Sequence, residues 1–431
     1  MNAEPTSYDV CVLGGGPAGA MIAARLSGFG FRVALLEGAT RAGWSCGYSI
    51  PAAAPRWLRE VGGGADFAQP GVLCLQGSRL RWGRDSIETR DGVSYVVDPL
   101  KFAATLRAEA VQQGVQLLQP VKVAHVEQLS DGWQIYCVTG QQLNAHFLVD
   151  ATGRRSKFAG TRSAYLPRTV ALTASFRDVP LPATHQCTEA LRDGWLWGAP
   201  LPDGRWGVAM FTNPAFLQGL TATQQTARLR EWLGASELLR SCLGRALATA
   251  PMVCDATGER ATEVATSRCL RIGDAALSLD PLSSQGVFAA LRSAWQGATV
   301  VRTILQRPAN AAAAIAFHEL HICNAAAHNR TTAAEIYASV RRLAAEPFWA
   351  ARAQAASVPA ASPRPMVIGA RFRLAAQAAP SHRHRAAGPV PPRGSQRPAQ
   401  RRHAARDRRG AALRLHRPRH RGARSAGAQR R

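Results

Sequence analysis

The sequence lacks the features of a secreted or membrane-spanning protein. It contains no run of 18 apolar residues, so we expect no helix that crosses a membrane. Its 9 cysteines are scattered without a Cys-x-x-Cys pair, which indicates reduced thiols and not a disulfide framework. The first predicted strand begins near residue 8 and leaves no room for a secretory signal. These absences predict a cytoplasmic protein that has no membrane partner.

A glycine-rich fingerprint lies close to the N-terminus. Residues 9–13 form a short apolar run that predicts a buried parallel strand, and we expect a helix to follow. Between them, Gly14 suits a tight turn, Gly16 lets the backbone approach a pyrophosphate, and Gly19 lets helix and strand pack closely. The pyrophosphate would lie at the helix N-terminus, where free amides and the helix dipole favour an anion. The binding residues expected in this loop are Gly14, Gly16, Pro17, Ala18 and Gly19.

An acidic residue completes this nucleotide-binding pattern. A second predicted strand at 32–36 is followed by Glu37, at the spacing where a carboxylate takes the ribose hydroxyls of a dinucleotide. No second fingerprint of this kind follows a strand elsewhere, so we expect no separate NAD(P)H domain. Electrons for a redox reaction would come either from NAD(P)H that docks transiently or from a partner reductase, and the sequence leaves both open.

Residues 269–287 indicate that the dinucleotide is FAD. A predicted strand at 269–273 runs into Asp274, and an Asp in this place can hydrogen-bond the ribityl chain of a flavin. The helix expected to begin near Gly286 can direct its N-terminal amides at the N1/O2 edge of the flavin ring. An Asp-capped helix with no ligand is the structural alternative. The binding residues expected here are Asp274, Pro281, Gln285, Gly286 and Val287.

Five segments match one family of flavoproteins. They are GGGPAGA (14–20), GYSIP (47–51), FLVDATGRRS (147–156), GWLWGAP (194–200) and GDAALSLDPLSSQGV (273–287), with a weaker match in EIYASVRRLAAEPFW (335–349). On these segments, the chain resembles FAD-dependent monooxygenases of the halogenase-like branch over about residues 7–350. The resemblance implies an α/β fold: a Rossmann-like FAD-binding domain of the aromatic-hydroxylase type, an inserted antiparallel-sheet substrate domain and C-terminal helices. The branch includes tryptophan halogenases, aromatic hydroxylases and flavoproteins that mature tryptophylquinone cofactors by oxidising a Trp in a partner protein.

Two catalytic side chains of the halogenases are missing from this sequence. Halogenases carry a lysine after the GYSIP segment that converts hypohalous acid into a usable electrophile, yet residues 74–90 contain no lysine. Halogenases also place a glutamate where this chain has Ser283. The lysines of the whole chain are Lys101, Lys122 and Lys157. The resemblance therefore argues against halogenation.

Three residues fit the halogenase-like Trp-x-Trp-x-x-Pro pattern, which is thought to keep substrate and flavin chemistry apart. They are Trp195, Trp197 and Pro200. Two further positions depart from the branch, because Tyr48 stands where it usually has Glu and Pro99 where it often has Arg. The GYSIP and DPLSSQG variants look closest to the tryptophylquinone-maturation group, of the quinohemoprotein amine dehydrogenase type.

The predicted function is FAD-dependent hydroxylation of an aromatic, indole-like ring. Reduced FAD and O2 give a flavin C4a-hydroperoxide, which transfers oxygen to an electron-rich ring when the protein excludes water and positions that ring. The substrate is either an aromatic small molecule or a Trp of a partner protein, and no catalytic base is predicted. The alternatives are a tryptophan halogenase that uses unrecognised residues, a non-oxygenating flavin reductase, and an Arg-tail binding protein with a vestigial flavin site.

Apolar side chains in the middle of the chain are candidates for a substrate wall. They are the run 170–176 together with Trp195, Trp197, Trp206, Val208 and Phe211. The stripe as a unit is the best wall candidate, and ordinary core of an antiparallel sheet is the alternative for each single residue. Tyr48 is a further wall candidate. No metal site is expected, because His318 and His321 fit a solvated helix face better than a zinc site.

The motif positions divide the chain into expected parts. The FAD domain would comprise 7–60, 95–165 and 265–305, the substrate domain 61–94 and 166–264, and the C-terminal helices 306–353.

Most of the positive charge lies in the C-terminal tail. Of the net charge of +25, residues 361–431 carry +18, from 19 Arg and one acid, Asp407. The tail has too few apolar side chains for a core and is predicted to be disordered. An arginine-rich arm for nucleic acid or an acidic partner is one interpretation. We favour a shifted reading frame in GC-rich DNA, or a tail without function, and we expect no nucleic-acid partner.

Overall fold

A computed structural model describes residues 6–38, 46–61, 67, 71–156, 158 and 160–357. All of them belong to the first of two units into which the chain divides, Met1–Val367. The predicted disordered tail at 361–431 lies outside the described residues and stays a prediction.

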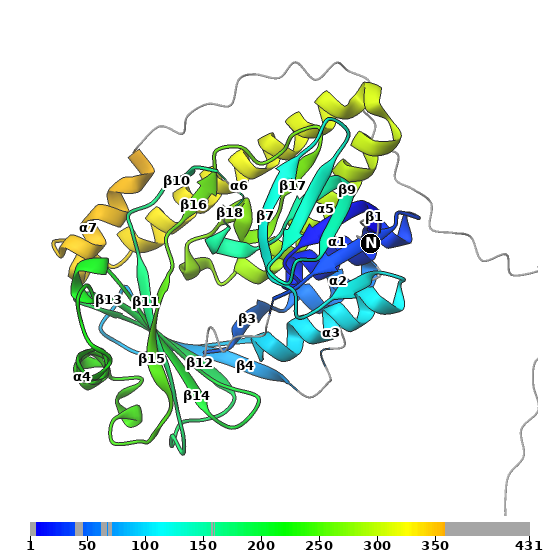
Figure 1. Ribbon diagram of the computed structural model, residues 1–431. Coiled ribbons are helices and arrows are strands. Elements are labelled where there is room, and N and C mark those ends of the chain that lie inside the picture. The colour runs from blue at the N-terminus through cyan, green and yellow to red at the C-terminus, as the bar shows by residue number, and fades with distance from the viewer. Residues whose placement is uncertain are drawn as a thin grey trace, which may run out of the picture. The chain divides into compact units, whose positions relative to one another are not determined.

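The first sheet combines parallel strands with a meander (Figure 1). Across the sheet, the parallel strands are β6 (Gln116–Leu118), β2 (Val33–Leu36), β1 (Thr6–Leu13), β9 (Gln142–Asp150) and β17 (Cys269–Arg271). The meander continues from β9 through β8 (Trp133–Cys137) to β7 (Val123–Gln128). The sequence pattern predicts strands at 122–129, 133–139 and 145–150, and the structure confirms all three. The order of the parallel strands and the helices that pack on them confirm the expected Rossmann-like α/β region.

Three helices support this sheet and place its loops. They are α1 (Pro17–Gly28), α3 (Pro99–Gln112) and α5 (Gly286–Gln306), and α1 packs against both others. α3 begins after Asp98, whose carboxylate accepts hydrogen bonds from the backbone N–H groups of Leu100 and Lys101 at 2.9 Å. Ile22 and Leu26 of α1 are fully buried in the core that covers the strands.

The second sheet is large and mainly antiparallel. Its strands, in order, are β15 (Leu247–Asp255), β11 (Val170–Phe176), β14 (Trp206–Thr212), β13 (Gly194–Pro200), β12 (His185–Leu191), β4 (Val72–Arg81), β5 (Glu88–Val97) and β3 (Tyr48–Pro51). β12 and β4 form its parallel pair. The sequence pattern predicts strands at 168–178, 194–200 and 205–212, which the structure confirms as β11, β13 and β14. It predicts no strand in the β4–β5 hairpin, whose polar residues mask the alternation. β3 lies in this sheet, although 7–60 was expected to belong to the FAD domain.

Both faces of the second sheet are covered. One face packs against α4 (Ala222–Ala235) through Leu229, Trp232 and Leu233. The other packs against α6 (Ala311–Ala338) and α7 (Pro347–Ala353) (Figure 1). α2 (Ala53–Glu60) packs on the core of the first sheet. A small third sheet of β10 (Arg162–Ala164), β16 (Glu259–Ala261) and β18 (Leu277–Ser278) lies beside α6.

The expected aromatic wall is not one surface. Trp195, Trp197 and Phe211 belong to the core on the α6–α7 face, whereas Trp206 and Val208 belong to the core on the α4 face. The physical reason is the pleat, because successive side chains of a strand point to opposite faces. The stripe read from the sequence therefore combined two faces. No helix among the described residues is long and apolar enough to span a membrane.

The interpretation of His318 as part of a solvated helix face is wrong. Its side chain on α6 is 1% exposed, and its Nε2 lies 2.9 Å from the backbone carbonyl oxygen of Arg271 in β17. Burial lowers the pKa of His318 to about 4. The imidazole therefore stays neutral and ties α6 to the end of the first sheet. No cluster of three metal-ligating side chains occurs among the described residues.

This burial predicts a specific loss of stability in acid. The folded-state pKa of His318 lies below its ordinary value of 6.5, so the contribution is complete above pH 6.5 and disappears as pH falls towards 4. Between pH 7 and pH 4, the unfolding free energy of the native chain should fall by roughly 3 kcal/mol more than that of His318→Gln. Urea unfolding at several pH values measures this difference. His328→Gln, at an exposed position of the same helix, is the control, and its unfolding free energy should fall by as much as that of the native chain between pH 7 and pH 4. Parallel pH profiles for native chain and His318→Gln would contradict the assignment.

Candidate flavin site

The glycine loop between β1 and α1 is packed tightly on one side and open on the other. Gly14 has a φ of +97°, and a Cβ there would lie 2.5 Å from the carbonyl oxygen of Ala151. A Cβ on Gly19 would collide with the carbonyl oxygen of Gly14. By contrast, a Cβ on Gly16 would meet no atom within 4 Å among the described residues. A ligand can therefore reach the loop backbone at Gly16, where the sequence predicts the pyrophosphate.

Two helix N-termini are available to hold anionic or electron-rich groups. α1 starts after Gly16 with Pro17 and Ala18, has no side-chain cap and has no acidic residue in its first turn. α5 starts at Gly286 after Gln285 and shows the same two features. Both helices begin beyond the carboxyl ends of parallel strands, the region where open α/β sheets bind nucleotides. The residues present therefore fit an FAD at both of its expected contact points.

Glu37 lies at the end of β2 beside the glycine loop. Its carboxylate accepts a hydrogen bond from the backbone N–H of Gly15. On the same loop, Arg107 of α3 donates a hydrogen bond of 2.9 Å to the carbonyl oxygen of Gly15. The predicted ribose-binding acid is thus beside the loop, as expected. Arg107 was missed, because its sequence position says nothing about which loop α3 covers.

Asp274 lies in a short turn, η4 (Gly273–Ala275), directly after β17. Arg154 places its Nε 3.2 Å from the Asp274 carboxylate and also donates to the carbonyl oxygens of Thr257 at 2.8 Å and Leu279 at 3.1 Å. The Arg154 side chain is only 26% exposed, so its guanidinium is a partly buried contact between these segments and not a free surface charge. The sequence leaves open whether an arginine of the pair Arg154 and Arg155 contacts the cofactor or a partner or lies on the surface, and Arg154 is bound to the turn that carries Asp274.

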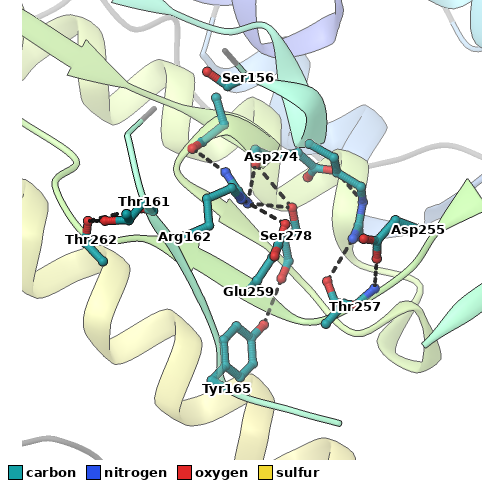
Figure 2. A network of polar contacts seen from close by, with 12 residues as sticks. Ser156, Thr161, Arg162, Tyr165, Asp255, Thr257, Glu259, Thr262, Asp274 and Ser278 are labelled. Atoms are coloured by element: carbon teal, nitrogen blue, oxygen red, sulfur yellow. Dashed lines mark hydrogen bonds and ion pairs between the residues drawn. The ribbon is translucent and has the colours of Figure 1, made fainter. Parts of the chain in front are cut away.

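Arg162 of β10 holds the same turn from its backbone side (Figure 2). Its guanidinium donates to the carbonyl oxygens of Asp274 at 3.0 Å and Ala275 at 2.8 Å, and to the hydroxyl of Ser278 at 3.1 Å. It also forms an ion pair of 2.8 Å with Glu259. A planar guanidinium suits this task, since its N–H groups diverge in a fixed fork. The turn that presents Asp274 is therefore set by neighbouring side chains and is prepared for a ligand.

Tyr48 of β3 belongs to the same region. Burial first and the nearby Asp274 carboxylate second raise the pKa of its phenol to about 12, and Arg154 acts in the opposite direction. This electrostatic coupling shows that the GYSIP and Gly-Asp segments, distant in sequence, lie close together. Tyr48 is partly buried, and its role as a substrate wall stays a prediction.

A chain of buried hydrogen bonds links the substrate-wall candidate Trp195 to the loop before α5. The indole N–H of Trp195 donates to the hydroxyl of Tyr337 at 3.3 Å, and this hydroxyl lies 3.2 Å from both carboxylate oxygens of Asp280. Burial raises the pKa of Asp280, while the Leu282 N–H, Arg352 and the Tyr337 hydroxyl lower it in part. Asp280 directly precedes Pro281, the first residue of the loop that runs through Gln285 to Gly286 and Val287.

The two tryptophans of the Trp-x-Trp pattern are covered by other side chains. Trp195 is 3% exposed, stacks on Phe211 at 4.0 Å between ring centroids and meets Trp82 edge-on at 6.1 Å. Trp197 is 7% exposed and donates its indole N–H to Gln186 at 3.1 Å. These contacts are those of a packed core, and a role as substrate wall stays a prediction.

The segment in which halogenases carry their lysine, residues 74–90, runs from strand β4 to the start of β5. Its basic residues are arginines, and Arg81 forms ion pairs with Glu189 and Glu237, each at 3.2 Å. Among the described residues, Lys101 lies in the first turn of α3 and Lys122 is exposed before β7. Lys157 lies outside the described residues. No described lysine therefore lies in β4.

Comparisons with known proteins agree on one family. A family model described as tryptophan halogenase matches residues 69–377. The putative FAD-dependent oxidoreductase LodB of Marinomonas mediterranea is 30% identical over 307 residues, which cover 67% of this chain and 83% of that protein. Tryptophan 2-halogenase of Chondromyces crocatus is 26% identical, with 73% of this chain and 65% of that protein covered.

Two solved structures are also similar to this chain. The peptidyl tryptophan dihydroxylase QhpG, essential for tryptophylquinone cofactor biogenesis, has a TM-score of 0.68 and 28% identity, with 81% of this chain and 79% of QhpG covered. The flavin-dependent halogenase CmlS has a TM-score of 0.72, but its 21% identity over 80% of this chain and 68% of CmlS supports the fold alone.

Replacing Gly16 by Ala tests the pyrophosphate position. The backbone at Gly16, with φ of −68° and ψ of −178°, accepts an alanine, and its Cβ would enter the open space. We expect unchanged stability but an FAD affinity reduced at least about tenfold, or roughly 1.4 kcal/mol. Titration of the apoprotein with FAD, followed by flavin fluorescence, measures the dissociation constant. Gly28→Ala, at the other end of the same helix, is the control and should bind FAD normally. Equal FAD affinities for Gly16→Ala and Gly28→Ala would refute the position.

Replacing Tyr337 by Phe tests the buried hydrogen-bond chain. The change removes one donor to Asp280 and leaves the indole N–H of Trp195 without its acceptor, so stability should fall by about 1–3 kcal/mol. Tyr136→Phe, whose hydroxyl contacts Gln134 and Glu127 near the surface, should cost less than about 0.5 kcal/mol. Urea unfolding of both variants makes the comparison, and equal losses would show that the buried chain contributes nothing specific.

Proposed function

Because this chain belongs to the tryptophan halogenase family and is an FAD-dependent monooxygenase, we propose that it hydroxylates an indole ring. We further propose that the ring is that of a Trp in a partner protein, during biogenesis of a tryptophylquinone cofactor. The observation that carries the proposal is the absence of lysine from residues 74–90, where Arg81 of β4 is held in ion pairs with Glu189 and Glu237. Ser283 in place of the halogenase glutamate supports the same conclusion. The resemblance to QhpG supports a Trp within a polypeptide as the substrate.

Each part of the site would hold a different part of FAD. Gly14, Gly16 and Gly19, with the N-terminus of α1, would hold the pyrophosphate of FAD, and Glu37 the ribose. Asp274 would hold the ribityl chain in the orientation that Arg154 and Arg162 give its turn. The N-terminus of α5 would face the pyrimidine edge of the flavin. The loop before α5 would contribute Pro281 and Gln285, and the first turn of α5 would contribute Gly286 and Val287.

When bound and reduced, FAD supplies the reaction of O2 with an electron-rich ring. The chain's own contribution is then to bind the ring, exclude water and keep it in place. The aromatic core around Trp195 excludes water on one side, and the hydrogen-bond chain to Asp280 fixes that core to the loop before α5. Hydroxylation of an electron-rich indole needs little help from an acid or base, which fits a site without an evident catalytic base. Electrons would come from NAD(P)H or from a partner flavin reductase.

Halogenation of tryptophan is the second candidate function. The family model and the Trp-x-Trp-x-x-Pro residues at 195–200 favour it. It would require a residue other than a β4 lysine to deliver the halogen, and the arginines of β4 lack a nucleophilic amine at neutral pH.

Product mass separates these functions. FAD-loaded protein, NADH and a generic flavin reductase are incubated with tryptophan or with Trp-containing peptides, each with and without bromide, while O2 consumption is recorded. We expect one or two oxygen atoms added to the indole of a peptide and no bromine isotope pattern. A brominated product would show that the protein is a halogenase and not a hydroxylase. Turnover without O2 consumption would identify a non-oxygenating reductase. If all substrates give only hydrogen peroxide, a Trp residue is not the substrate.

A further inference from the structure

A cavity of about 550 Å³ lies apart from the residues expected to bind FAD. It is bounded by β10 and the segment after it, by β16, by the middle of α6 and by the end of α7. Its lining includes Arg260, Cys323 and Arg330 but none of the predicted FAD-binding residues. The family reaction, as derived above, assigns it no role.

Two guanidinium groups give this cavity a positive charge. Arg260 and Arg330 both line it, and none of the described lining residues is acidic. Arg330 has a buried Nε without a hydrogen-bond partner among the described residues. Arg260 contacts the Cys323 sulfur at 3.6 Å, whereas its neighbour Glu259 is already paired with Arg162. An anion in the cavity would accept hydrogen bonds from these guanidinium groups.

The rest of the lining is small and mostly apolar. It includes Leu166, Pro167, Ala326, Ala327, Ala351 and Ala355. Such side chains leave room for a compact apolar group beside the two arginines and offer a bare phosphate few polar contacts. Tyr165 also lines the cavity, but its hydroxyl is already held by the Ser278 carbonyl and Asn329, both at 2.9 Å. The two arginines are therefore the groups that would recognise a charge.

We propose that this cavity binds the carboxylate of an organic acid with a compact apolar body, through Arg260 and Arg330. Guanidinium groups match carboxylates in geometry and remain charged at any physiological pH. None of the described lining residues supplies a carboxylate of its own. The acid therefore comes from elsewhere, either as a free molecule or as an acidic side chain of a polypeptide. This inference does not depend on the reaction proposed above.

Cys323 reports occupancy of the cavity. The full-length protein is treated with iodoacetamide in the presence of benzoate, and alkylation of each cysteine is followed by mass spectrometry. We expect saturating benzoate to slow alkylation of Cys323 at least about fivefold and to leave the exposed Cys74 unchanged. Benzamide, the uncharged analogue, should protect much less. Acetyl-Ala-Glu-Ala-amide distinguishes the source, because protection by it as strong as by benzoate supports a polypeptide acid, whereas protection by benzoate alone supports a free acid.

Matched variants localise the effect. Arg260→Gln and Arg330→Gln should each lose the protection at Cys323, Arg330→Lys should retain part of it, and Arg240→Gln, an exposed arginine elsewhere, should behave as the native chain. Unchanged protection in both Gln variants would overturn the proposal. So would equal protection by benzamide, protection by inorganic phosphate alone, or no protection by any of these probes.

Discussion

The guanidinium of Arg162 is the contact on which the candidate site depends. It spans from Glu259 in the third sheet to the backbone of Asp274 and Ala275, directly beyond the end of β17. The turn it holds contains Gly273 at a φ of +54°, and a Cβ there would lie 2.9 Å from that of Ala18 in α1. One partly buried cation therefore fixes a backbone turn against the helix that the glycine loop begins. Because its hydrogen bonds go mainly to carbonyl oxygens, they leave the carboxylate of Asp274 for other partners.

The sequence predicted those parts of the site that are local in the chain. The glycine loop, Glu37 and the Gly-Asp turn each occupy a few consecutive residues between predictable elements, and the strand order confirms that framework. Arg107, Arg162 and Tyr337 act on residues far from them in sequence, so no spacing could reveal them. The opposite faces taken by Trp195 and Trp206 depend on the register between β13 and β14, which only the folded sheet defines.

The resemblance to halogenase-like monooxygenases is confirmed as family membership, but the fold does not choose between oxygen and halogen transfer. Halogenases and a tryptophan dihydroxylase share this architecture, so the choice rests on a few side chains. In this chain the relevant strand is β4, where the Arg81 guanidinium lies between Glu189 and Glu237. A cation held by two carboxylates serves to join strand β4 to the segment after α4. Arg81 therefore stabilises the sheet, and strand β4, which has no lysine, offers no free amine.

The direction of the hydrogen bonds at Tyr337 follows from the chemistry of its neighbours. An indole N–H can only donate, so Trp195 requires the Tyr337 oxygen to accept. The single Tyr337 hydrogen is then left for Asp280, which must offer an unprotonated oxygen to receive it. Arg352, 1% exposed in α7, lies 5.9 Å from the centre of the Tyr337 ring, and its charge favours the ionised form of Asp280. Burial acts in the opposite direction, so this carboxylate depends on the donors around it. A movement of the loop before α5 that displaced Asp280 would therefore leave a buried hydroxyl without its acceptor. That cost couples the loop expected beside the flavin to the aromatic core of the second sheet.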